Sequence, residues 1–238
     1  SLFSIDYKTL IIVGSAVECI HAYSLIHDDL PCMDDDKIRR GKPSTHIKFG
    51  ESTAVLAGNS LLTLAFEIIS HGKNLLSSNK KIEIINLLSN CSGHTGIAGG
   101  QELDLKFENK KKGINQILGM QRKKTGKLFN FCFRSVAIVA NKSNKDKEYF
   151  GRLGEEVGLL FQLSDDFLDL KGSKKLVGKP IKKDKKKGKS NLVNLIGYEN
   201  SLKYAENLEK KILLKLSKHG KNAFDLINTI KFINERNF

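Results

Sequence analysis

Two groups of aspartates, far apart in the sequence, carry the side chains best suited to chemistry. The first group puts five carboxylates into residues 28–36, and Arg39 and Arg40 follow closely. Carboxylates this close repel one another. A hard divalent cation relieves the repulsion, and magnesium binds a few carboxylates while keeping waters and phosphate oxygens in its shell. The guanidinium groups offer paired hydrogen bonds to phosphate oxygens. The pattern predicts a site for a metal-bridged diphosphate; the alternative is a solvated, salt-bridged turn.

The second group lies within residues 162–169 and contains Asp165, Asp166 and Asp169. On a helix, Asp165 and Asp169 share one face, where like charges are destabilising unless something neutralises them. The preceding residues 157–161 are strongly apolar, so we expect this face near the core, where unpaired carboxylates are costly. A second metal-binding group is predicted, with a surface triad paired to lysines as the alternative.

The elements that must position these groups are helices. Apolar residues recur at helical spacing over residues 9–29, and Pro31 must end that helix because it lacks a backbone donor and disfavours helix in the residue before it. Asp28 and Asp29 therefore sit at a helix C-terminus, where the helix dipole is already partially negative. Carboxylates placed against this rule indicate a functional site.

The rest of the chain is also predicted to be helical, which makes the fold class all-α. Proline is rare, tryptophan is absent, and the turn signals of a β-sandwich are missing. Two longer basic connections, around residues 109–113 and 171–189, have the length of active-site lids. Further helices are expected at residues 52–71, 80–96, 114–140, 145–170, 201–218 and 222–235.

Composition and length bound the class of protein. The 238 residues are 40% hydrophobic and 28% charged, which predicts one soluble globular domain. No apolar run near the start approaches the roughly 20 residues of a membrane span, and no signal peptide is recognisable. The scattered cysteines suggest reduced thiols and a cytoplasmic location. The net charge of +14 points to an anionic partner, but no nucleic-acid recognition motif accompanies it, so nucleic acid is not expected.

Together the two aspartate groups resemble the motifs of trans-prenyltransferases, the farnesyl and geranylgeranyl diphosphate synthase family. The similar stretches are residues 16–57, the sequence GGQELDL from Gly99, KKTGKL from Lys123 and FQLSDDFLDLKG from Phe161. The resemblance implies a helical bundle of the isoprenoid synthase type with a central active-site cavity. A terpene cyclase, which shares this architecture, is disfavoured because its second metal motif ordinarily contains Asn, Ser or Thr, and Glu.

The resemblance also implies roles for individual residues. Three magnesium ions are expected in each active site. Asp28 and Asp34 resemble the ligands of two of them, with Asp29 in support, and Asp165 resembles the ligand of the third. The implied metal-binding residues are Asp28, Asp29, Asp34, Asp165, Asp166 and Asp169, and the implied catalytic residues are Asp28, Asp29, Asp34, Lys124 and Asp165.

Substrate-binding residues follow from the same resemblance. Arg40 and His21 match residues that hold isopentenyl diphosphate, and Thr125 and Gln162 match polar residues of the allylic pocket. The groups matching those that grip the allylic diphosphate are Arg39, Lys124, Lys179 and Lys189. Because Lys179 and Lys189 flank a basic loop, we expect that loop to close over a bound diphosphate.

The product is predicted from the residues before the first aspartate group. Tyr23, with Ser24 beside it, matches the position that caps the hydrocarbon tunnel, and a bulky ring there should stop growth near C15. The resemblance therefore implies a homodimeric farnesyl diphosphate synthase that uses isopentenyl diphosphate and an allylic diphosphate. A geranylgeranyl diphosphate synthase and a non-catalytic partner subunit of a prenyl synthase remain alternatives.

Two departures from the family pattern stand out. The family's upstream Gly-Gly-Lys-x-x-Arg-Pro motif, whose cations bind isopentenyl diphosphate, is not in the printed sequence, so we expect N-terminal helices to be missing from it. Asn59 stands where the family has an aspartate in Gly-Asp-Ala-Leu-Leu.

Overall fold

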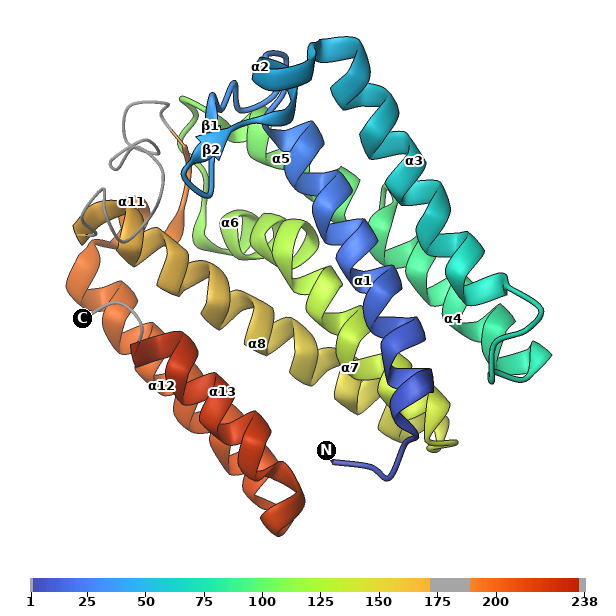
Figure 1. Ribbon diagram of the computed structural model, residues 1–238. Helices are drawn as coiled ribbons and strands as arrows, with labels where there is room; N and C mark the ends of the chain where they lie inside the picture. Colours follow the sequence, from blue (N-terminus) through green and yellow to red (C-terminus); the bar gives the residue numbers. More distant parts are fainter. Residues whose placement is uncertain (1, 172–188, 236–238) are drawn as a thin grey trace.

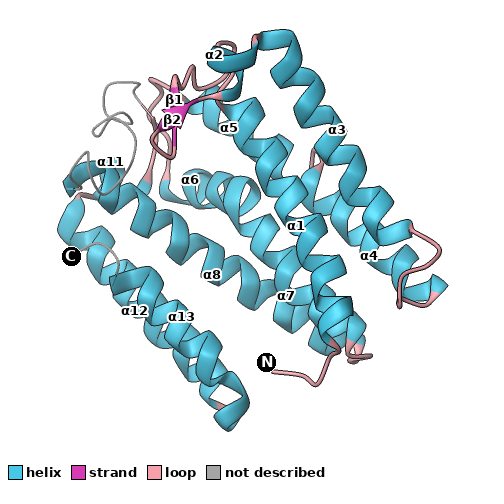
Figure 2. Ribbon diagram, in the orientation of Figure 1, coloured by secondary structure: helices cyan, strands magenta, loops and turns pink. Residues whose placement is uncertain are grey.

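The computed structural model describes residues 2–171 and 189–235, and this part of the chain is almost entirely helical (Figures 1 and 2). The all-α prediction is confirmed. The longer helices are α1 (Tyr7–Asp28), α3 (Glu51–Ser70), α4 (Ser78–Ser92), α5 (Ile97–Phe107), α6 (Ile114–Gln121), α7 (Lys127–Val139), α8 (Asn144–Lys171), α12 (Tyr198–Ser217) and α13 (Phe224–Glu235). Short elements complete it: α2 (Thr45–Phe49), α11 (Leu192–Ile196), a π-helix (Arg122–Gly126), a 3-10 turn (Gly220–Ala223) and the strands β1 (Ile38–Arg39) and β2 (Lys42–Pro43).

Helix α1 begins and ends where its sequence dictates. The Asp6 side chain caps its N-terminus by accepting a hydrogen bond from the Thr9 amide at 2.8 Å. At the other end Asp29 is the C-cap, two residues before Pro31. The chain then folds back on itself, and the Asp34 amide donates to the Asp28 carbonyl at 2.8 Å. This turn brings both ends of the first aspartate group together.

A short hairpin with two-residue strands follows, and its two neighbouring arginines, Arg39 and Arg40, point in different directions. Ile38 pairs with Pro43, and Arg39 pairs with Lys42. The central residues Arg40 and Gly41 have φ values of 51° and 74°, as tight hairpin turns require. The hairpin lies at the same end of the bundle as α2 and α11 (Figure 1).

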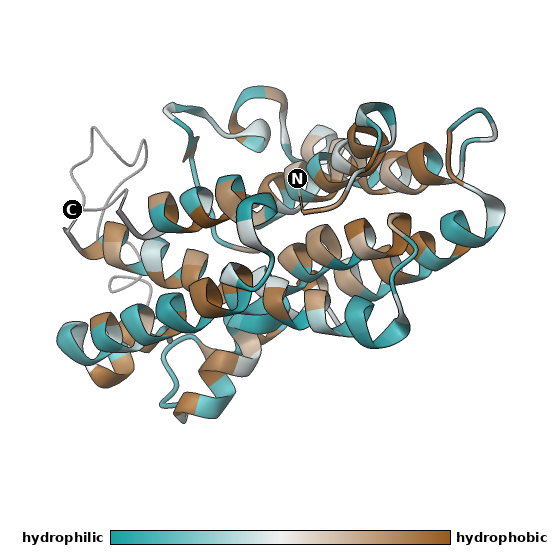
Figure 3. Cartoon of the chain, turned by 90° about the horizontal axis from the view of Figure 1, so that it is seen from below, coloured by the Kyte–Doolittle hydropathy of each residue, from teal (hydrophilic) through white to brown (hydrophobic). Residues whose placement is uncertain are grey.

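Two buried clusters form the core, and α7 contributes to both. One cluster joins α1, α3, α4 and α7 around Ile20, Ile84 and Phe131; the other joins α8 to α12 and α13 around Leu160 and Leu163. Each such side chain contributes about 1.5–3 kcal/mol when fully buried. Apolar residues accordingly run along helix faces, while the connections are mostly hydrophilic (Figure 3). These two clusters hold α1 and α8, which carry the two aspartate groups, in fixed positions.

Three features differ from the elements expected. Helix α5 was not predicted, and the helix expected at residues 114–140 contains the π-helix between α6 and α7. The short α2 and α11 were also missed. The basic connection expected at residues 171–189 falls almost wholly on residues 172–188, outside the described part of the chain.

Two helices, α1 and α3, are long and apolar enough to cross a membrane by length and composition. Core helices of soluble proteins pass the same test, so this is weak evidence for a span. The two helices pack against each other, and both contribute residues to the first core cluster.

Candidate active site

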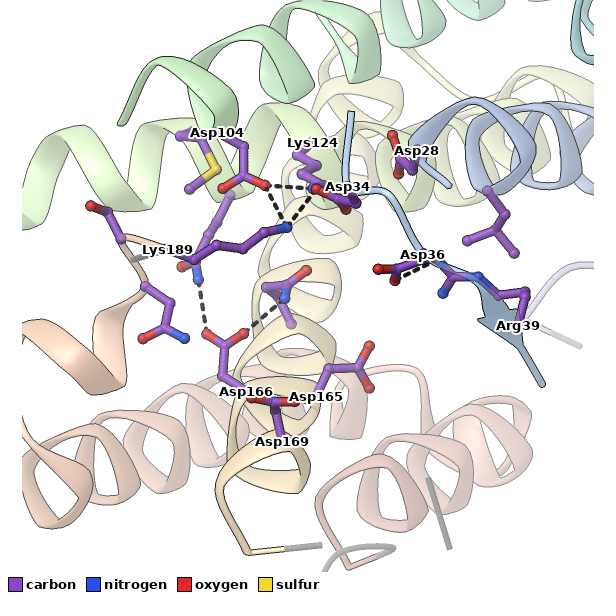
Figure 4. Close-up of a pocket in the computed structure, with 16 residues that line it drawn as sticks. Asp28, Asp34, Asp36, Arg39, Asp104, Lys124, Asp165, Asp166, Asp169 and Lys189 are labelled. Atoms are coloured by element: carbon purple, nitrogen blue, oxygen red, sulfur yellow. Dashed lines mark hydrogen bonds and ion pairs between the residues drawn. The ribbon is translucent and has the colours of Figure 1, made fainter. Parts of the chain in front are cut away.

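A single pocket collects residues of both aspartate groups (Figure 4). Its walls come from the end of α1, the following turn and hairpin, α5, α6, the π-helix, α8 and the segment that precedes α11. The described lining residues are Leu25, Asp28, Asp34, Asp36, Arg39, Asp104, Met120, Gln121, Lys124, Gln162, Asp165, Asp166, Asp169, Lys189, Ser190 and Asn191. Charged side chains dominate this lining, and Leu25 and Met120 supply its large apolar surfaces.

From the first aspartate group, Asp28 and Asp34 face the pocket. The pKa of Asp28 is raised to about 6, mainly by burial and partly by the neighbouring Asp34, while Lys124, Lys189 and Arg39 oppose the shift. A carboxylate with a raised pKa is one whose negative charge is incompletely compensated. The pocket therefore offers Asp28 as a ligand for an added cation.

Asp29 has a different role from Asp28, although the two residues are adjacent in the sequence. It is 2% exposed and does not line the pocket. Its two carboxylate oxygens accept hydrogen bonds from Arg39 Nε at 3.2 and 3.1 Å, and Arg39 Nη2 also bonds to it. Asp36 pairs with the same guanidinium at 3.5 Å. Asp29 thus fixes Arg39 at the pocket wall, and its implied part in metal binding and catalysis stays a prediction.

The second aspartate group lies on α8, across the pocket from the first (Figure 4). Asp165 and Asp169 line the pocket. Asp166 also lines it, but its two oxygens accept from amides: Gln162 Nε2 at 2.9 Å and Gln121 Nε2 at 3.1 Å. The three carboxylates, alike in sequence, therefore meet different surroundings.

Gln162 links this group to Thr125 on the π-helix. The Thr125 hydroxyl donates to Gln162 Oε1 at 2.7 Å, while Gln162 Nε2 donates to Asp166. Because Asp166 accepts from the amide nitrogen, the amide oxygen is turned toward Thr125. Thr125 and Gln162, both predicted for the allylic pocket, are therefore in contact; Gln162 lines the pocket and Thr125 does not, and their role in substrate binding stays a prediction.

Two lysines lie between the aspartate groups. Lys124 Nζ bonds to Asp104 Oδ2 at 2.6 Å, and Lys189 Nζ bonds to Asp34 Oδ1 at 2.9 Å and to Asp104 Oδ2 at 3.4 Å. Burial alone would lower the pKa of Lys124, but Asp104 and Asp28 outweigh it and the pKa is raised. Lys124 is thus kept as a cation. Lys179, predicted for the same task, lies outside the described residues.

The two residues predicted for isopentenyl diphosphate lie next to each other beside this pocket. Arg40 Nη2 is 3.4 Å from His21 Nε2, and neither side chain lines the aspartate pocket. Burial lowers the pKa of His21, and the positive charges of Arg40 and Arg39 also favour the neutral ring. A neutral imidazole beside an arginine can donate or accept a hydrogen bond, depending on its tautomer.

The residues predicted to limit chain length sit one helical turn below the first aspartate group. Tyr23 is 7% exposed; its hydroxyl donates to the Ser92 carbonyl at 3.4 Å, and its ring makes an edge contact with His27. Ser24 instead donates to the His21 carbonyl. Neither residue lines the pocket. Asn59 is exposed on α3, away from it.

The carboxylates present fit magnesium, provided that a ligand completes its shell. Among the described residues, no three acidic, histidine or cysteine side chains lie close enough together to hold an ion by themselves. Asp28 and Asp34 instead face Asp165 and Asp169 across a gap. Magnesium takes a few carboxylates and keeps phosphate oxygens and waters in its octahedral shell, so this donor set suits ions shared with a diphosphate.

Reasoning from the sequence missed several pocket residues, among them Asp104 and Gln121. Asp104 belongs to the quoted GGQELDL stretch, but nothing in a lone aspartate reveals two lysine partners. Gln121 is 3% exposed; its Nε2 bonds to Asp166, and its buried Oε1 has no hydrogen-bond partner in the described part of the chain. Its only signal was a polar residue on the apolar face of α6, and that is a weak one.

Comparisons with known proteins identify relatives of this chain. The profile of the polyprenyl synthetase family matches residues 3–230. The chain is 44% identical to farnesyl diphosphate synthase of Bacillus subtilis (strain 168) over 79% of its length, and it spans 64% of that relative. It is 39% identical to farnesyl diphosphate synthase of Escherichia coli (strain K12), covering 99% of the chain and 81% of the relative.

The chain is also similar to a geranylgeranyl diphosphate synthase and to a solved geranyltransferase structure. A geranylgeranyl diphosphate synthase of Cyanophora paradoxa is 38% identical over 93% of the chain and 74% of that protein. A crystal structure of a Helicobacter pylori geranyltransferase, complexed with magnesium and isoprenyl diphosphate, superposes with a TM-score of 0.86 at 32% identity, covering 96% of this chain and 79% of that one.

Proposed function

The chain belongs to the polyprenyl synthetase family, and on that basis we propose that it is a prenyltransferase that condenses isopentenyl diphosphate with dimethylallyl or geranyl diphosphate to give (2E,6E)-farnesyl diphosphate. The observation that carries the proposal is the pocket itself. Two aspartate groups on α1 and α8 face each other across a space into which Arg39, Lys124 and Lys189 also project. The relatives from Bacillus subtilis and Escherichia coli support the C15 product.

The residues of the pocket would stabilise a departing diphosphate. In the first step the bond between the allylic carbon and the diphosphate oxygen breaks, and its electron pair leaves with diphosphate. Lys124 is held as a cation by its surroundings, and Arg39 is held in place by Asp29. Fixed positive groups aimed at developing negative charge lower the barrier without reorganisation. The apolar Leu25 and Met120 would keep water from the allylic cation.

Asp28, Asp34, Asp165 and Asp169 would hold magnesium in this pocket. When bound, magnesium would neutralise the diphosphate and act as a Lewis acid on it. We assign three such ions to the site, the number that the family resemblance implies.

The second substrate would bind beside the first. Arg40 and His21, 3.4 Å apart, would hold the diphosphate of isopentenyl diphosphate. The double bond of that substrate attacks the allylic carbon, and a proton is then lost from the adjacent carbon of the condensed product. We assign this proton to the released diphosphate. The Tyr23 ring, fixed by the Ser92 carbonyl and His27, would close the tunnel below the reacting carbons and limit the product to C15.

Two wider features belong to the same proposal. Residues 1–238 would act as one prenyl synthase unit in a homodimer, with the apolar side chains that α3 exposes, Val55, Leu56 and Leu64, buried between the copies. Size-exclusion chromatography with light scattering tests the dimer.

The four cysteines are free thiols, and the bacterial relatives favour a cytoplasmic location.

The test is incubation with magnesium, isopentenyl diphosphate and each of dimethylallyl, geranyl and farnesyl diphosphates, followed by chromatography of the dephosphorylated products. Farnesol from the two shorter starters, with farnesyl diphosphate unused, is the expected result. Geranylgeraniol would overturn the role given to Tyr23 and favour a geranylgeranyl synthase. No product, despite metal-dependent diphosphate binding, would favour a non-catalytic partner subunit.

Variants in the same assay separate the ligands from their neighbours. Asp28→Asn and Asp165→Asn should each lower magnesium-dependent turnover by at least roughly 100-fold, because losing even a residue that only supports a metal ligand costs that order. Circular dichroism should show unchanged helicity. Asp35→Asn is the matched control: Asp35 is exposed and does not line the pocket, and asparagine tolerates its positive φ of 46°. Full activity in Asp28→Asn would refute the proposed mechanism.

A further inference from the structure

Asp104 is a buried carboxylate that belongs to neither aspartate group. It lies on α5 and is 5% exposed. One of its oxygens, Oδ2, accepts from Lys124 Nζ at 2.6 Å and from Lys189 Nζ at 3.4 Å (Figure 4). Two ammonium groups therefore meet at a single oxygen atom inside the pocket.

The two lysines come from segments far apart in the sequence. Lys124 is on the π-helix, and Lys189 lies just before α11. Like charges repel, and the repulsion is strong where water is scarce. A shared carboxylate is the arrangement that lets both ammonium groups stay charged and close together. Without Asp104, we expect each lysine side chain to turn toward solvent or toward another acid.

A second acid that Lys189 contacts in the described part of the chain, Asp34, also has another role. Asp34 accepts from Lys189 at 2.9 Å, but in the proposed function Asp34 binds magnesium. A carboxylate bound to magnesium is a poor partner for an ammonium group beside the ion. Asp104 can keep its hold on Lys189 when Asp34 is engaged, because it lies on the far side of the two lysines from α8 (Figure 4).

We propose that Asp104 is a positioning residue for the allylic diphosphate: it anchors Lys124 and Lys189 so that their remaining N–H donors point at the diphosphate between the two aspartate groups. The inference rests on the proposed function for the identity of the substrate. Asp104 does not touch the substrate. It acts through the lysines, so its loss should weaken diphosphate binding on the allylic side and leave the isopentenyl side, at His21 and Arg40, nearly unchanged.

The test compares Asp104→Asn and Asp104→Glu with Glu102→Gln. Glu102 is two residues away on α5 and also pairs with a lysine, Lys106, but both of those side chains are more than 60% exposed. For each variant KM is measured separately for geranyl diphosphate and isopentenyl diphosphate, together with kcat and the melting temperature. Calorimetry measures the affinity for inorganic pyrophosphate with magnesium.

In Asp104→Asn, KM for geranyl diphosphate should rise by roughly tenfold or more, as loss of a charged hydrogen-bond partner predicts, while KM for isopentenyl diphosphate stays within about twofold. Asp104→Glu keeps the charge and should recover part of the loss. Glu102→Gln should match the wild type. Equal changes in both KM values, or a lower kcat with both KM values unchanged, would overturn the inference.

Pyrophosphate binding separates this inference from the proposed function. If the wild-type protein makes no prenyl product, the proposed function fails. Weaker binding of pyrophosphate with magnesium in Asp104→Asn than in Glu102→Gln would still support the role of Asp104, and equal binding would overturn it. If Asp104→Asn does not fold, Asp104→Ser, which removes the charge with a smaller side chain, decides: a rise in KM confined to geranyl diphosphate supports the anchor, and wild-type kinetics refute it.

Discussion

Replacing Gly100 with alanine should damage the active site without placing any new atom in the pocket. A Cβ atom on residue 100 of α5 would lie 2.2 Å from the Lys124 nitrogen and 2.5 Å from the Lys124 Cα, both backbone atoms that cannot rotate away. Ordinary contact of a Cβ begins at 3.4 Å. The π-helix and α5 must therefore separate by about 1 Å, a misplacement that can cost about 100-fold in rate when it moves a catalytic group.

The separation acts on one ion pair in particular. Asp104 is one turn after Gly100 on the same helix, and it holds Lys124 at 2.6 Å. Moving α5 away lengthens that contact. We expect Gly100→Ala to lower kcat/KM for geranyl diphosphate by about 100-fold. Overpacking should also lower the free energy of unfolding by about 1–3 kcal/mol, which is a few degrees in Tm for a chain of this size.

The assay is steady-state prenyl transfer at a temperature well below Tm, with thermal unfolding followed by circular dichroism. Gly119→Ala is the matched control. Gly119 lies in α6 near the same π-helix, but an added Cβ there meets nothing within 4 Å. It should keep wild-type kinetics and gain up to about 1 kcal/mol of helix propensity. Wild-type kcat/KM in Gly100→Ala would refute the close packing of α5 against the π-helix and the role that we give it.

Two further predictions concern other parts of the molecule. Glu156 on α8 accepts from Lys215 and pairs with Lys211 on α12; burial alone would raise its pKa, but the two lysines lower it below 4.5. Its contribution is therefore present at neutral pH and is lost as the pH falls through the lowered pKa, so Glu156→Gln should reduce the free energy of unfolding by up to about 1 kcal/mol at pH 7 and by less at pH 3. Urea titrations at both pH values measure this, and an equal loss at both would contradict it. Burial raises the pKa of the Cys91 thiol to about 11, so iodoacetamide at pH 8 should alkylate the exposed Cys32 first; peptide mass spectrometry that finds Cys91 labelled first would contradict this.

The sequence allowed the placement of α1 and α8 and of their aspartates because each depends on local signals. Pro31 ends α1, and an apolar run precedes Asp165. Helix α5, in contrast, does not follow from local sequence signals. Gly99 and Gly100 lower its intrinsic helix propensity by about 1 kcal/mol each, so local signals argue against a helix. Gly100 is nevertheless required there, because only a residue without Cβ lets α5 approach the Lys124 backbone. This helix is specified by packing between segments distant in the sequence.

The π-helix and the separate surroundings of the aspartates have the same origin. A period of 3.6 residues accounts for α6 and α7 on either side, but it does not reveal the wider turn at residues 122–126 that carries Lys124 and Thr125. Asp165 and Asp166 look equivalent in the sequence. Successive helix positions are about 100° apart, and the amides of Gln121 and Gln162 lie on the side to which Asp166 points. Only the packing of α6 against α8 shows that difference.

The charges of the pocket bear on the order in which its ligands arrive. Among the described residues that line it, aspartates exceed cationic side chains by four. A free diphosphate entering between the two aspartate groups would meet these carboxylates as well as Lys124 and Lys189. Both lysines are already engaged with aspartates, at 2.6 and 2.9 Å. Magnesium bound at Asp34 would remove one of those partners from Lys189 and make the local potential less negative at the same time. The metal and the diphosphate should therefore bind together or metal first, each raising the affinity for the other by the same factor.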